Sequence, residues 1–394
     1  MLNKLLISHG KLVSAGFVVI CVLQCFAFTE SGSPFYNQSF GWSFNFIIVF
    51  ILLGVYLRFG DITSVNGVAI WFTICFFTNW LLELYHSYGS MTLFSSLYPI
   101  VLSSFVLLKN EIKERAFCYF RIMFVIMSFC GIIAYFLYIF DLYPPLSFEN
   151  MYDGTRHQYA NYGLAYLFVP TMGLTRLCGL FNEPGYFGTI GALVLIADKC
   201  RVNKCNIIIF FSCILSFSVA FFVLIFFFIF LQSFFKKNYS IIFFILIFGY
   251  IIYIVLSSLL DSDYLEMFID RFMIEDGKLA GDLRISDNLD LFWTEICNDT
   301  EKSLFGLGKL LPPTGSSSYK ILVIKHGIIG VFLIFAPFLF AAFSLCKKNT
   351  NAIILCTAFI ISIYQRPQIF TLVYFLVLIG GIIHLKKINI KNNR

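Results

Sequence analysis

Three arginines occupy unusual positions in an otherwise apolar chain. Arg176, Arg284 and Arg366 lie in short polar stretches beside or between apolar runs, where a guanidinium is costly unless it is paired or lines an aqueous pocket. The planar guanidinium is also the side chain best shaped to bind a phosphate through two parallel hydrogen bonds. We therefore expect Arg176 and Arg284 to act on an anionic substrate and Arg366 to help bind it. The alternative for each is a structural ion pair or an interfacial side chain.

Two further side chains could transfer a proton. Glu183 follows Arg176 by seven residues, so the two would share a face if the stretch were helical. Glu183 could then be a general base, an ion partner of Arg176, or an acid at the start of a helix. His326 is a second candidate base, although a lone His in an apolar stretch is more often structural.

Several common functional motifs are absent from the chain. It contains no P-loop, no GxGxxG at a strand-to-helix junction, no HExxH and no GxSxG, which argues against ATP-driven pumping and the common hydrolases. The twelve cysteines show no CxxC pair and no Cys/His metal spacing, so no metal site is predicted. The net charge of +6 comes from cations scattered in short groups, which is not a nucleic-acid signal.

The composition is that of a membrane protein. Of the 394 residues, 59% are hydrophobic and only 13% are charged, and Phe alone occurs 50 times. A soluble domain typically has about 25% charged residues. A water-soluble core could not bury this much apolar surface, whereas a bilayer accepts it. We therefore expect one polytopic membrane domain over residues 1–394.

The elements that must position the candidate residues are apolar runs, and a helix needs about 20 largely apolar residues to cross a membrane. They predict an all-α integral membrane protein with about twelve transmembrane helices. The predicted spans are 12–29, 41–58, 67–84, 91–108, 120–140, 185–198, 206–218, 220–235, 240–259, 320–346, 352–365 and 369–385. The pair within 206–235 could also be one long helix, but two helices joined near residues 216–218 fit the charges better.

The charges indicate the orientation of these spans. With the N-terminus inside, most of the 28 cations fall in inner segments and most of the 22 acids fall outside, as the positive-inside rule requires. Both termini are then expected to be cytoplasmic, with the chain in an inner (plasma) membrane.

Two outer segments are longer than simple connectors. They cover about 141–184 and 260–319, and loops of this length are usually functional. The second contains helix-like stretches at 261–275 and 286–301 and is expected to cap the outer face. At the end of the first, glycines and Pro184 predict a broken helix or tight turn, with the next helix starting at Pro184 and Gly185.

Taken together, these motifs and the topology resemble a known enzyme family, the O-antigen or capsule repeat-unit polymerases (the Wzy group), which are related to the O-antigen ligases. The resemblance covers most of the chain from about residue 140 and rests on four short elements in order. They are RLCGLFNEPG at 176–185, Arg284 followed by LFGLG at 304–308, GSSSY at 315–319 followed by GIIG at 327–330, and YQRP at 364–367.

The resemblance implies an activity. Such enzymes transfer a growing glycan from undecaprenyl diphosphate to a new lipid-linked repeat unit at the periplasmic face, without nucleotide or metal, and a chain-length regulator is a possible partner. Arg176 and Arg284 would hold the departing diphosphate. Asn182 and Tyr319, which lie within the matching elements, would contact the substrate. The related ligases often carry a His where this chain has residues 316–318, so the general base stays open between Glu183 and His326.

Two other functions remain open. One is the O-antigen ligase, with lipid A core as acceptor, although the missing His argues against it. The other is a flippase or exporter of the same lipid-linked sugars. A flippase is expected to have small outer loops and cations in a central cavity, and the two long outer segments argue against that.

Overall fold

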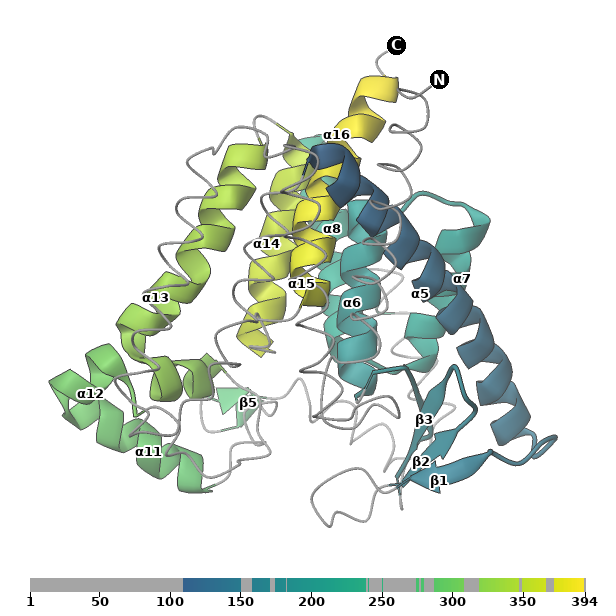
Figure 1. The fold of residues 1–394 in the computed structure, drawn as a ribbon, viewed down its shortest axis with the longest axis horizontal. Coiled ribbons are helices and arrows are strands. Elements are labelled where there is room, and N and C mark those ends of the chain that lie inside the picture. The colour runs from purple at the N-terminus through teal and green to yellow at the C-terminus, as the bar shows by residue number, and fades with distance from the viewer. Residues whose placement is uncertain are drawn as a thin grey trace, which may run out of the picture.

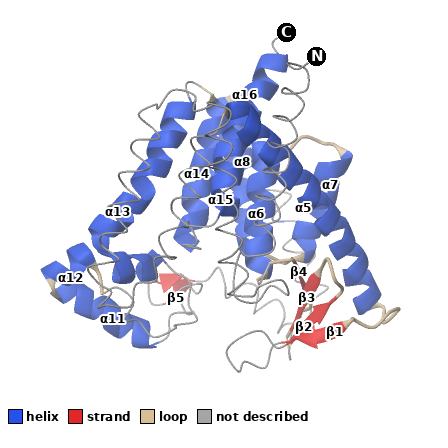
Figure 2. Ribbon diagram, in the orientation of Figure 1, coloured by secondary structure: helices blue, strands red, loops and turns tan. Residues whose placement is uncertain are grey.

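The computed structural model describes the chain from residue 109 onward, with gaps. The described residues are 109–149, 158–170, 174–181, 183–238, 240, 250, 274–275, 278–279, 287–307, 319–346, 349–365 and 372–392. This part is mostly helical (Figures 1 and 2). The predicted spans before residue 109 lie outside the described residues, as does almost all of the predicted span 240–259.

One described helix is long and apolar enough to cross a membrane. It is α5 (Asn110–Ile139), which extends the predicted run 120–140 toward the N-terminus. Shorter apolar helices follow at α6 (Pro184–Ala197), α7 (Lys204–Leu215), α8 (Val219–Phe235) and in α14 (Thr350–Gln365). The prediction of about twelve transmembrane helices therefore stays a prediction.

The stretch 206–235 forms two helices, as predicted. Ser216 and Phe217 follow the end of α7, and Phe217 takes a positive φ of 46°, which turns the chain back. Ser218 then caps α8 by accepting a hydrogen bond from the Phe221 amide. A serine side chain at this position satisfies one of the amides that lack a partner within the helix.

Helix α6 lies at the centre of the core, and every one of its residues is buried. It starts at Pro184, as the sequence predicts, because proline suits the first turn of a helix. Two of its glycines allow α7 and α8 to approach closely. A β-carbon at Gly188 would lie 2.4 Å from that of Ser218, and one at Gly191 would lie 2.2 Å from the Cys213 sulfur. Small residues serve the same purpose in membrane helix pairs.

The remaining helices complete the bundle. They are α11 (Asp287–Asn298), α12 (Thr300–Phe305), α13 (Tyr319–Cys346), α15 (Leu372–Phe375), the π-helical turn η4 (Leu376–Gly380) and α16 (Gly381–Asn392). Helix α13 is not straight, because Gly327 has a non-helical backbone (φ 65°, ψ 175°). The predicted run 320–346 is thus divided into a short piece and a long piece.

The first long segment contains a small antiparallel sheet that the expected all-α fold did not include. Its strands, in spatial order, are β1 (Ser147–Glu149), β2 (Gln158–Asn161), β3 (Tyr166–Val169) and β4 (Arg176–Gly179). The rings of Tyr159 and Phe168, which are directly opposite in register, meet edge to face at 5.4 Å. Such cross-strand pairs stabilise a sheet. A two-residue ladder, β5 (Ile274–Glu275) with β6 (Lys278–Leu279), lies in the second long segment.

The described parts of the two long segments lie at the same end of the bundle. Figure 1 shows the β1–β4 sheet on one side of that end and α11 and α12 on the other. Helix α16 and the C-terminus lie at the opposite end. We call these the sheet end and the α16 end.

Candidate functional site

Arg176 is fixed at the sheet end by strand pairing and by hydrogen bonds. It begins β4 and lies opposite Phe168 of β3. Its Nε donates to the Ser216 carbonyl at 3.1 Å, and its Nη2 donates to the Phe217 carbonyl at 3.4 Å. These carbonyls follow the C-terminus of α7, where helix carbonyls lack internal partners and the dipole favours a cation. The guanidinium therefore joins the sheet to the turn between α7 and α8.

Glu183 lies at the start of α6. It is the N-cap residue, with an extended backbone and no side-chain capping bond, and its carbonyl accepts the amides of Tyr186 and Phe187. A shared helical face for Glu183 and Arg176 was expected only if the stretch were helical. That condition is not met, because Arg176 is in a strand and Gly179 takes a positive φ of 63° before the helix begins. Glu183 lies at the positive end of the α6 dipole, which supports its interpretation as an acid at a helix start.

His326 is buried, with 6% of its surface exposed, directly before the kink in α13. At that kink a β-carbon on Gly327 would lie 2.2 Å from the Leu304 carbonyl oxygen of α12. The Leu307 amide also donates to the Ile324 carbonyl at 2.7 Å. His326 is thus next to a tight junction between α12 and α13. This junction and the β1–β4 sheet lie on different sides of the sheet end (Figure 1).

The segment before α13 packs on it through a small second core. Ile296 of α11 and Ile324 of α13 are its buried members. The Lys320 ammonium lies 5.6 Å from the centre of the Trp293 ring, a geometry typical of a cation–π contact. The predicted helix-like stretch 286–301 therefore forms α11 and the start of α12, and it is anchored to α13.

The side chains of four predicted site residues lie outside the part of the chain that the structure describes. Arg284, Arg366 and Asn182 lie outside the described residues, as does most of the helix-like stretch 261–275. Tyr319 begins α13, but its side chain lies outside the described part.

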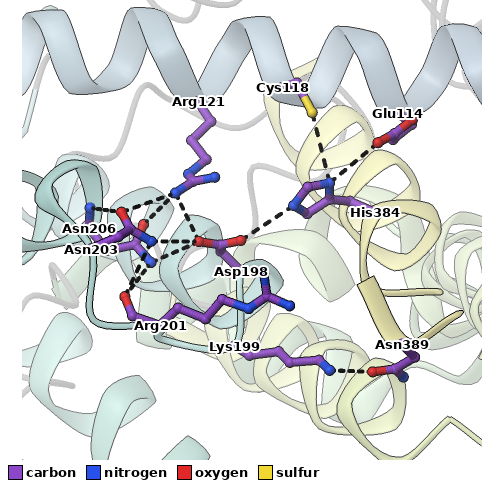
Figure 3. A network of polar contacts seen from close by, with 10 residues as sticks. All are labelled: Glu114, Cys118, Arg121, Asp198, Lys199, Arg201, Asn203, Asn206, His384 and Asn389. Atoms are coloured by element: carbon purple, nitrogen blue, oxygen red, sulfur yellow. Dashed lines mark hydrogen bonds and ion pairs between the residues drawn. The ribbon is translucent and has the colours of Figure 1, made fainter. Parts of the chain in front are cut away.

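The densest polar cluster of the described residues lies at the α16 end, and its centre is Asp198 (Figure 3). Asp198 follows α6 and is only 3% exposed. Its Oδ2 lies 2.8 Å from Arg121 Nη2 of α5 and accepts a hydrogen bond of 2.8 Å from the Asn206 amide of α7. Its Oδ1 lies 3.3 Å from His384 Nε2 of α16. Four elements are therefore joined by one carboxylate, whose charge is compensated by Arg121.

The cluster continues on the other side of the His384 ring. Its Nδ1 lies 3.6 Å from Glu114 Oε1 and 3.8 Å from the Cys118 sulfur, both on α5. Glu114 also pairs with Lys387 at 2.7 Å, and this hydrogen bond raises the pKa of the Lys387 ammonium above its ordinary value. Asn203, whose Oδ1 accepts a hydrogen bond from Arg121 Nη2 at 3.5 Å, completes the cluster. We call Glu114, Cys118, Arg121, Asp198, Asn203, Asn206 and His384 the inner network, and Arg176, Glu183 and the 216–218 turn the outer junction.

The α16 end also gathers cations. Lys199 hydrogen-bonds to Asn389 of α16. Burial lowers the pKa of Lys199, and the nearby charges of Arg201 and Lys236 lower it further. All three cations are among those that the sequence assigns to the cytoplasmic side.

No residue of the inner network was predicted from the sequence to be a site residue. His384 and Asp198 are separated by 186 residues, and Glu114 and Lys387 by 273, so no local motif joins them. Two weak signals were present. Glu114 and Cys118 are four residues apart, which places them on one face of a helix, and Asp198 is an isolated acid beside Lys199 and Arg201.

Comparisons of the chain with protein-family models, with curated protein sequences and with solved structures found no match.

Proposed function

We propose that this chain is a polytopic membrane glycosyltransferase that polymerises lipid-linked oligosaccharide repeat units. The membrane part of the proposal is supported by apolar stripes that no described element covers. On α5, Ile122, Ile126, Phe129 and Ile133 are between 44% and 54% exposed and recur every three or four residues on one face. An exposed apolar stripe of this length suits contact with lipid.

The proposed orientation places the α16 end in the cytoplasm and the sheet end in the periplasm. Lys199, Arg201 and Lys236 gather at the α16 end, in line with the positive-inside rule. The described parts of both long segments lie at the other end (Figure 1).

The observation that carries the proposed activity is the position of Arg176. Its guanidinium is oriented by two backbone carbonyls at the sheet end, beside the N-terminal end of α6. In the proposed reaction an acceptor hydroxyl attacks the anomeric carbon of the donor sugar, the bond to the diphosphate oxygen breaks, and a base takes the hydroxyl proton. The leaving diphosphate gains negative charge, which a preoriented guanidinium and a helix N-terminus stabilise. Arg284 would contribute from the second long segment.

The test is a deletion of the gene, followed by gel analysis of the lipopolysaccharide. A lost polymerase leaves molecules with a single repeat unit. A lost ligase or flippase leaves molecules with none, and that result would replace the proposal with one of the two alternatives. Complementation with Arg176→Ala or Arg284→Ala should not restore long chains, although the membrane content of each variant stays normal. Wild-type chain lengths from the double variant would overturn the diphosphate-binding role of both arginines.

The orientation can be tested separately by cysteine labelling of intact cells. A membrane-impermeant reagent should label a cysteine introduced near residue 290 and spare one introduced near residue 237. The opposite pattern would overturn the topology without bearing on the reaction.

A further inference from the structure

Three side chains of the inner network converge around a single point (Figure 3). Glu114 and Cys118 come from one face of α5, and His384 comes from α16. A carboxylate oxygen, the thiol sulfur and the imidazole Nδ1 all lie within 4.8 Å of one another. These are three of the donor types that bind zinc in proteins.

The spacing of these atoms is close to that of a zinc site. Tetrahedral bonds of about 2.0 Å to nitrogen and oxygen and about 2.3 Å to sulfur place neighbouring donor atoms about 3.3–3.6 Å apart. The separation between His384 Nδ1 and Glu114 Oε1 is 3.6 Å, and that between His384 Nδ1 and the Cys118 sulfur is 3.8 Å. Contraction by a few tenths of an ångström would bring these two pairs to the spacing of a zinc site. The Glu114 oxygen and the Cys118 sulfur lie within 4.8 Å of each other and would have to approach by up to about 1.3 Å.

Asp198 supplies the support that a metal-binding histidine needs. Its Oδ1 lies 3.3 Å from His384 Nε2, so the carboxylate can accept the Nε2 proton and leave the Nδ1 lone pair directed at Glu114 and Cys118. A carboxylate on the far nitrogen is the usual partner of a histidine ligand and fixes its tautomer and orientation. Asp198 is itself held by Arg121 and Asn206, so it fixes the orientation of the His384 ring from the Nε2 side.

Charge and access both fit a divalent cation. The carboxylate of Glu114 and a thiolate of Cys118 would together neutralise Zn²⁺, while Arg121 balances Asp198 and Lys387 lies on the outer oxygen of Glu114. A cavity of about 470 Å³ is lined by Glu114 and Cys118, together with Glu111, Ile383 and the cations Arg115 and Lys387. It gives the ion an entry path and leaves room for a water as fourth ligand.

We propose that Glu114, Cys118 and His384 bind one zinc ion, which joins α5 to α16 at the α16 end. On binding, the Cys118 thiol releases its proton to solvent and the thiolate becomes a zinc ligand. The ion is a structural or regulatory link, separate from the proposed glycosyl transfer at the sheet end. The competing interpretation is a protonated His384 that bridges Asp198 and Glu114 without a metal.

The test uses the purified full chain in detergent, stripped with a chelator and titrated with Zn²⁺ alone. We expect one zinc per chain for the wild type and for Cys205→Ser, a control that removes an exposed cysteine on α7. Cys118→Ser and His384→Ala should each weaken binding at least 100-fold. Asp198→Asn should weaken it about 10- to 100-fold, the usual effect of losing such a partner. Failure of the wild type to bind zinc, or unchanged binding by Cys118→Ser, would overturn the proposal.

Two further measurements separate a lost ligand from a misfolded variant. Cobalt in place of zinc should give a near-ultraviolet thiolate-to-metal band in the wild type and in Cys205→Ser but not in Cys118→Ser. In the metal-free state Cys118→Ser should unfold within a few degrees of the wild type, and added zinc should raise the unfolding temperature of the wild type only. Equal zinc stabilisation of both proteins would contradict the site, and the lipopolysaccharide phenotype would be unaffected by that result.

Discussion

The two ends of the bundle manage their charges in different ways. In the inner network, Asp198 interacts with side chains of three other elements and is almost fully buried. At the outer junction, Arg176 donates hydrogen bonds to two backbone carbonyls of a turn. The Asp198 carboxylate joins the end of α6 to three other helices, whereas Arg176 lies at the end of the bundle where we propose that the reaction takes place. Substitutions in the inner network should therefore act on stability, and those at the outer junction on activity.

The strongest test of this contrast is removal of Arg121. Arg121→Ala leaves Asp198, whose side chain is only 4% exposed, without its cation. Breaking a buried ion pair in this way typically costs about 3–5 kcal/mol, and the partial exposure of Arg121 reduces our expectation to roughly 2–4 kcal/mol. This loss is measured as the change in the free energy of unfolding in detergent. Lys204→Ala, which removes an exposed cation of α7, should change it by less than about 0.5 kcal/mol. Equal effects of the two variants would contradict the structural role of the inner network.

Residues between the two ends of the bundle can be substituted without changing the inner network or the outer junction. Gly191→Ala places a methyl group where the Cys213 sulfur now lies, and overpacking of this kind costs about 1–3 kcal/mol. The double variant with Cys213→Ala should recover most of this loss, because the smaller residue vacates the space. A double variant no more stable than Gly191→Ala would show that α6 and α7 are not packed as described.

Arg176 should affect stability less than activity. Arg176→Ala removes two hydrogen bonds from a charged donor, and we expect a loss of about 1–3 kcal/mol because the carbonyl of the fully buried Ser216 loses this donor. Arg176→Lys keeps the charge but not the paired geometry. For both variants we therefore expect a small loss in the free energy of unfolding and a large loss of glycan chain length in cells. A variant that loses stability and chain length in proportion would indicate a purely structural arginine.

The smallest effect is expected for an exposed ion pair at the edge of the inner network. Lys387 pairs with Glu114 at 2.7 Å, but 69% of its side chain is exposed, and such pairs contribute about 0–1 kcal/mol. Lys387→Ala should therefore change the unfolding free energy by less than about 1 kcal/mol, and added salt should reduce the difference. If Lys387→Ala lost as much unfolding free energy as Arg121→Ala, side-chain exposure would not explain a difference between the Lys387–Glu114 and Arg121–Asp198 pairs.

Local signals in the sequence predicted the features that local residues determine. Pro184 marked the start of α6, and the serines near residue 217 marked the break between α7 and α8. The kink at Gly327 was missed because the apolar run continues through it, and the contact with α12 that requires it comes from another segment. Arg176 and Glu183 would have shared a face only in a helix, and the pairing of β4 with β3 places Arg176 in a strand instead.

The inner network shows why part of a site can be invisible in a sequence. Its members come from α5, from the end of α6, from α7 and from α16, and each residue taken alone has an ordinary structural interpretation. Only the packing of these helices brings Cys118 and His384 within 3.8 Å. Hydropathy predicted the helices that carry most of these residues, but it contains no information on which helices are neighbours.

The origin of His384 and Asn389 in α16 has a consequence for biosynthesis. Asp198 can meet Arg121 and Asn206 as soon as α5, α6 and α7 have been made, but its contact with His384 and the bond between Lys199 and Asn389 form only after α16 has been made, more than 180 residues beyond Asp198 and Lys199. Helix α16 thus completes a cluster that begins with α5, the first helix of the described part. A prematurely terminated chain would keep a loosely held α5 with exposed polar groups, which quality-control proteases could recognise.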